Sequence, residues 1–114
     1  MSQNPDIMAA LTALREGYDG LLAAKEETED PQLYAQLNDK LVAAQQRIAK
    51  LEGLVFAQRS QALAEAAAGV EAAQGELADA LKSVENLTHI VQTATALIGT
   101  VDKVISAAAS VGLG

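Results

Sequence analysis

The chain has 114 residues, a formal net charge of -7 and no cysteine, and 50% of its residues are hydrophobic although only 3% are aromatic. The acidic balance and the lack of a Lys/Arg-rich stripe argue against nucleic-acid binding, and the absence of cysteine excludes disulfide and thiol chemistry. Alanine and leucine carry most of the apolar content, which suits close helix–helix contact. The composition therefore predicts an all-α fold in one domain, residues 1–114.

The first predicted helix covers residues 5–27. Asn4 or Asp6 is expected to cap its N-terminus. The apolar residues of this segment recur at spacings of three and four, as in an amphipathic helix: Ile7, Leu11, Leu14, Tyr18 and Leu21. Gly17 and Gly20 weaken the helix by roughly 1 kcal/mol each relative to alanine, or they mark where another helix passes close.

A second, much longer helix is predicted over residues 31–82. Asp30 is a suitable N-cap and Pro31 a suitable first helical residue, and the short connection makes the first two helices antiparallel neighbours. The apolar residues in the first half of this helix have an average spacing of 3.5: Tyr34, Leu37, Leu41, Ala44, Ile48, Leu51 and Val55.

The step from Val55 to Leu63 shifts this apolar pattern by one residue. A continuous helix absorbs such a shift as a local change of supercoil. The alternative is a chain reversal between Gly53 and Ser60, but no Gly-Pro, Asn-Gly or Pro-Gly turn supports it. We therefore expect the helix to continue.

From Leu63 to Ile105, every seventh residue is a large aliphatic, which is the pattern of a helix that packs lengthwise on another helix. A third helix is predicted over residues 86–112. Ser83 and Asn86 favour a break before it because both are good caps, whereas the in-phase heptad favours continuity. The residues expected to form the core or an interface are Leu63, Val70, Leu77, Val84, Leu87, Val91, Leu97, Ile98, Val101 and Ile105.

The aliphatic block around Val91, Ile98 and Ile105 is the densest in the chain, and we expect Ile98 to lie at its energetic centre. The first helix is too short to cover the middle one. The sequence thus predicts a long antiparallel helical hairpin or three-helix coiled-coil bundle completed by oligomerisation. Residues 1–4 and 113–114 are expected to be flexible.

No catalytic, cofactor or metal site is predicted. His89 is the only histidine, and although Glu85 shares its helical face, the sequence offers no further ligands nearby. We interpret His89 as a surface residue. The acidic run at residues 26–30 lacks the alternating acids and the glycine of a calcium loop, and we interpret it as a solvated turn.

These features favour a non-enzymatic structural or protein–protein interaction module that acts through coiled-coil packing, with a second copy or another helical protein as its partner. The alternative is an exported or membrane-surface helical protein (a secretion-system component, a chaperone or a lipid-contacting protein) that uses its apolar C-terminal helix. Membrane contact is disfavoured because that helix lacks a basic polar face. A cytoplasmic location is expected, with signal-independent secretion as the alternative.

Overall fold

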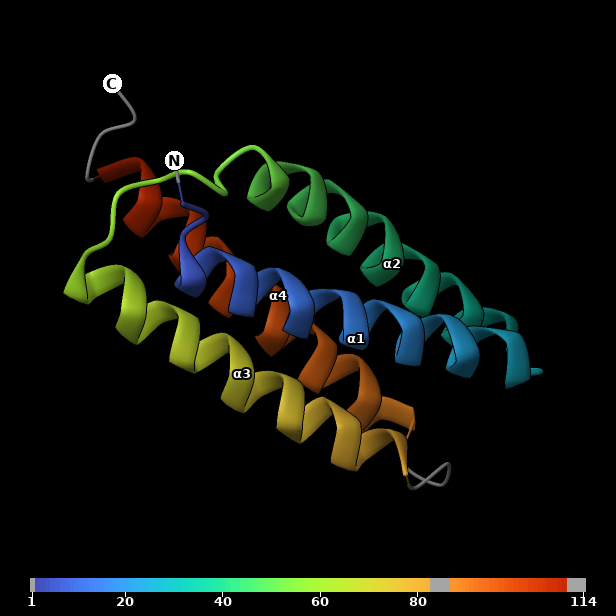
Figure 1. Cartoon of the computed structure of the whole chain (residues 1–114). Coiled ribbons are helices and arrows are strands. Elements are labelled where there is room, and N and C mark those ends of the chain that lie inside the picture. Colours follow the sequence, from blue (N-terminus) through green and yellow to red (C-terminus); the bar gives the residue numbers. More distant parts are fainter. Residues whose placement is uncertain (1, 83–86, 111–114) are drawn as a thin grey trace.

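The computed structural model describes residues 2–82 and 87–110, without the side chain of Leu87, and all regular structure in this part of the chain is helical. Figure 1 shows that the helices lie side by side along one long axis, and the Cα atoms extend over 47 × 20 × 19 Å. The helices have 21 to 24 residues each, so their lengths match. They are α1 (Pro5–Glu27), α2 (Pro31–Glu52), α3 (Gln61–Leu81) and α4 (Leu87–Ser110).

Local capping chemistry sets where the first three helices begin. The side-chain oxygens of Asn4, Asp30 and Ser60 accept hydrogen bonds from backbone N–H groups in the first turn, at 2.9 to 3.4 Å. Pro5 and Pro31 follow two of these caps, where a missing N–H has no consequence. The predicted helix over residues 5–27 and the predicted start at Pro31 are both confirmed.

The continuous helix predicted over residues 31–82 is wrong. α2 ends at Glu52, Gly53 caps it, and the backbone then makes two tight turns, in which Leu54 donates to Leu51 and Ala57 to Leu54. The bundle therefore contains four described helices instead of three. The one-residue shift of the apolar pattern marks this reversal, which is built without any of the usual turn dipeptides.

The helices are arranged around the bundle in the order α1, α2, α4, α3. α1 packs on both α2 and α3, and α4 packs on both of these as well, whereas α2 and α3 do not touch. Residues 53–60, which join α2 to α3, must therefore cross the bundle end diagonally. Figure 1 shows this connection passing beside the N-terminus, at the end away from the α1–α2 turn.

Asn4 ties this diagonal connection to the start of α1. Its backbone N–H donates to the carbonyl oxygen of Val55 (N···O 2.6 Å), and its side-chain Nδ2 donates to that of Ala57 (2.9 Å). The residue is only 2% exposed. The expectation that residues 1–4 are flexible is thus wrong for Asn4. Its side-chain oxygen caps α1, and its backbone N–H and side-chain Nδ2 bind the connection between α2 and α3.

Polar side chains on the surface fix the register of neighbouring helices. Arg47 forms a two-point ion pair with Asp102, which joins α2 to α4 at 3.0 and 3.3 Å. Such exposed pairs contribute at most about 1 kcal/mol each, so they orient the helices more than they stabilise them. Three side-chain bonds join α1 to α2: Arg15 to Glu52, Gln45 to Tyr18 and Lys25 to Asn38.

Gly17 allows α1 to approach α4 across the short diagonal of the bundle. A Cβ atom at this position would lie 2.6 Å from Cδ2 of Leu97 and 2.9 Å from Oε1 of Gln74. That Oε1 atom is buried and has no hydrogen-bond partner among the described residues. Gly20 likewise admits Leu81 of α3, whose Cδ1 would lie 2.6 Å from a Cβ there. Close passage of other helices, one of the two interpretations of these glycines, is therefore correct.

We predict that Asn4→Ala lowers the free energy of unfolding by roughly 2–4 kcal/mol, because it removes a cap and leaves the Ala57 carbonyl without its donor. Ser60→Ala, which removes only a cap, is the control and should cost about 1 kcal/mol. Urea unfolding followed by circular dichroism measures both. Equal losses would show that the bond to Ala57 contributes nothing.

We also predict opposite effects for two Gly→Ala variants. Gly17→Ala overfills the core at a cost of roughly 1–3 kcal/mol, which exceeds the gain in helix propensity of about 1 kcal/mol. At Gly75 the added methyl meets nothing within 4 Å, so Gly75→Ala should stabilise by up to about 1 kcal/mol. Thermal unfolding distinguishes them, and stabilisation by both would refute the close approach of α4 at Gly17.

Candidate functional site

The structure divides the ten predicted core or interface residues into three groups. The fully buried ones, each at most 1% exposed, are Leu63, Val70, Leu77, Leu97 and Val101. The half-buried ones are Val91, Ile98 and Ile105. Val84 and the side chain of Leu87 lie outside the described residues. The heptad therefore predicts the inner face of α3 well and that of α4 less well.

The inner face of α4 is rotated by about one residue from the Val91 series. Its buried stripe follows the neighbouring aliphatic series instead: Ile90, Leu97 and Val104, with Ala94, Val101 and Ala108 beside it. The reason is that α4 packs on three helices, with Leu97 pointing along the diagonal toward Gly17. Ile98, the expected energetic centre, is half-buried, whereas its neighbour Leu97 is 1% exposed.

The polar residues singled out in the sequence lie on the surface. His89 is exposed, as expected, and Glu85 lies outside the described residues. Across residues 2–82 and 87–110, no three His, Asp or Glu side chains gather where they suit a metal ion. All four acids of α3 are exposed on its outer side: Glu65, Glu71, Glu76 and Asp79.

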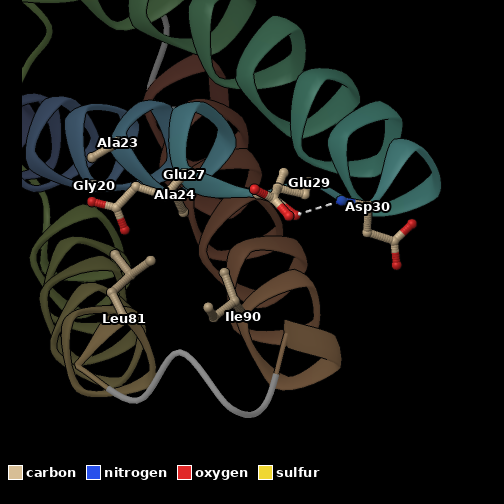
Figure 2. A pocket seen from close by; sticks show the side chains of 9 residues that line it. Gly20, Ala23, Ala24, Glu27, Glu29, Asp30, Leu81 and Ile90 are labelled. Carbon is tan, nitrogen blue, oxygen red and sulfur yellow. Dashed lines mark hydrogen bonds between the residues drawn. The ribbon is translucent and has the colours of Figure 1, made fainter.

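A pocket of about 540 Å³ lies near the end of the bundle where α1 turns into α2. Its walls are apolar and come from three helices, and its rim is formed by the acidic turn at residues 27–30. Figure 2 shows Leu81 and Ile90 reaching from α3 and α4 toward α1, below the small residues of that helix. The apolar lining residues are Gly20, Ala23, Ala24, Leu81 and Ile90.

The hollow exists because α1 presents small residues at helical spacing to its neighbours. Gly20, Ala23 and Ala24 lie on one face of the helix, three and four residues apart. Leu81 packs closely against Gly20, but the two alanines leave space beyond it. The acidic run was correctly interpreted as exposed, yet the pocket behind it was missed. The signal for it was this group of small residues just before the acids.

The three carboxylates of the rim differ in how they are used. Asp30 caps α2 through its Oδ1 atom, and Figure 2 shows its side chain directed away from the pocket. Neither Glu27 nor Glu29 forms an ion pair with a residue in the described ranges. The nearby Lys25 donates to Asn38 and lies over the ring of Tyr34, 5.0 Å from its centroid. The pocket mouth therefore carries negative charge that no cation among the described residues neutralises.

No known protein family, curated protein or solved structure matches this chain. None of the described helices combines the length and the apolar character that crossing a membrane requires.

We predict that Leu97→Ala lowers the free energy of unfolding by roughly 2–5 kcal/mol, because this side chain is 1% exposed in the centre of the bundle. The adjacent Ile98→Ala removes a half-buried side chain of the same size and should cost about 1 kcal/mol. Urea unfolding of both variants provides the comparison. A larger loss for Ile98→Ala would restore the Val91 series as the inner face of α4.

Proposed function

We propose that the protein is a non-enzymatic interaction module that binds another protein through its helical surface. The observation that carries this proposal is the pocket at the end of the bundle, whose apolar walls come from three helices. Such a hollow accommodates a side chain of a partner.

Two kinds of partner were expected, a second copy of this chain and a different helical protein. A second copy was expected because the predicted helices had unequal lengths. The four described helices have similar lengths, so this reason no longer applies. We therefore favour a different protein as the partner. Light scattering coupled to gel filtration distinguishes the two against a monomer mass of 11.8 kDa.

The competing proposal is a protein that meets a membrane surface or a secretion partner through its C-terminal helix. For lipid contact, the apolar residues of α4 would have to leave the core, where Leu97, Val101 and Val104 are at most 1% exposed. Opening the bundle forfeits that burial, at roughly 1.5–3 kcal/mol for each large side chain. A cytoplasmic location agrees with the interaction module and stays a prediction.

Hydrogen exchange with and without liposomes tests the two proposals. For an interaction module we expect the amides of residues 93–108 to be strongly protected in the free protein and unchanged by vesicles of neutral and anionic phospholipid, because their helix is packed on three others. Fast exchange in the free protein, or protection that appears only with vesicles, would favour the membrane-surface protein instead.

A further inference from the structure

We propose that the pocket at the end of the bundle binds a segment of a partner protein that presents an aliphatic side chain beside a lysine or arginine. This inference rests on the proposed interaction role and specifies the chemistry of the partner. It combines two independent properties of the site, an apolar interior of defined size and a mouth with unneutralised carboxylates.

The interior selects an apolar group. About 540 Å³ is within the range of pockets that hold small organic groups, and it is far larger than a metal ion or a single water needs. The apolar walls supply no polar side-chain atom, so a polar group placed there would lose its hydrogen bonds to water. These walls are formed by Gly20, Ala23, Ala24, Leu81 and Ile90. An aliphatic side chain loses none and gains contact with three helices.

The mouth selects a cation next to that apolar group. Glu27 and Glu29 are exposed and unpaired within the described structure, and Lys25 is held by Asn38 on the side of α2. A Lys or Arg on the incoming segment would find two carboxylates without displacing an existing ion pair. The contribution of each exposed charge is modest, and its main effects are on orientation and on the rate of association.

Charge also separates this partner from a second copy of the chain. The protein carries a net charge of -7, and α3 contains four acids without a Lys or Arg between Gln61 and Leu81. Two such surfaces repel each other, whereas a basic segment is attracted. The occupant is therefore a basic, aliphatic segment of a different protein.

The test uses the full-length, ¹⁵N-labelled protein and two synthetic amphipathic peptides that differ only in charge, one built from Leu and Lys and one from Leu and Glu. We expect the Leu/Lys peptide to shift the amide signals of residues 20–30, 81 and 90, and the Leu/Glu peptide to cause no shift. The double variant Glu27→Lys/Glu29→Lys should bind the Leu/Lys peptide at least about tenfold more weakly.

A matched double variant, Glu65→Lys/Glu71→Lys, makes the same change in net charge on the outer side of α3 and should weaken binding no more than about twofold. Ala24→Leu, which narrows the pocket, should abolish binding, whereas Ala35→Leu on the exposed side of α2 should not. Thermal unfolding checks that the variants fold. The two charge variants replace exposed side chains, so they remain informative even if Ala24→Leu unfolds the chain.

Equal weakening by the two double variants would overturn the proposal, since binding would then be general attraction to an acidic protein. Shifts confined to α3, or equal binding of the Leu/Glu peptide, would also overturn it while leaving an interaction role in place. If neither peptide binds, the pocket is not a site for a basic segment. The interaction role is tested separately by hydrogen exchange of α4.

Discussion

The hydrogen bonds of Asn4 hold together two parts of the fold that no helix–helix contact joins. α2 and α3 lie on opposite corners of the bundle and do not touch; each packs on α1 and α4, and the connection between them has to cross the bundle end diagonally. Asn4 caps α1 with its side-chain oxygen and binds the carbonyls of Val55 and Ala57 with its two donors. Because these groups are buried, losing any bond would leave a polar atom without water. The N-terminus of α1 thereby fixes where the chain crosses from α2 to α3.

Small residues on α1 then determine both where the bundle is tight and where it is hollow. The Leu97 side chain of α4 occupies the space that a side chain at Gly17 would need, which lets α1 and α4 approach across the short diagonal. One turn further on, Leu81 fills the space at Gly20, but no described side chain of α3 or α4 fills the space beside Ala23 and Ala24. The pocket is therefore a consequence of the same feature that closes the core. A larger residue at Gly17 would disturb the core, whereas a larger residue at Ala23 or Ala24 would fill the pocket.

Local chemistry explains which parts of the fold were predictable. The extent of α1 and the start of α2 follow from an N-cap followed by proline, a signal contained in a few adjacent residues. The reversal after Glu52 depends on bonds between Asn4 and residues more than fifty positions away, so its local sequence shows only a one-residue shift and a serine cap. The face that α4 buries was similarly misplaced by one residue, because heptad spacing fixes the pattern but not which of two adjacent aliphatic series meets three neighbouring helices. The pocket combines residues from three helices, and only its wall on α1, the small residues before the acids, forms a pattern in the sequence.

The acidic turn shows which charges the fold requires and which it does not. Asp30 is required, because it supplies the cap that starts α2. Glu26 and Glu27 lie in the last turn of α1, where the helix dipole disfavours negative charge by roughly 0.3–1 kcal/mol for each residue. Glu29 forms no ion pair in the described structure either. At residues 26 and 27 folding alone would favour neutral or basic side chains, as Lys25 illustrates, whereas Glu29 lies just before the N-terminus of α2, where the dipole favours an acid. Glu27 thus opposes the stability of α1 while it lies at the rim of an apolar hollow, which is consistent with the proposal of a partner that brings a positive charge.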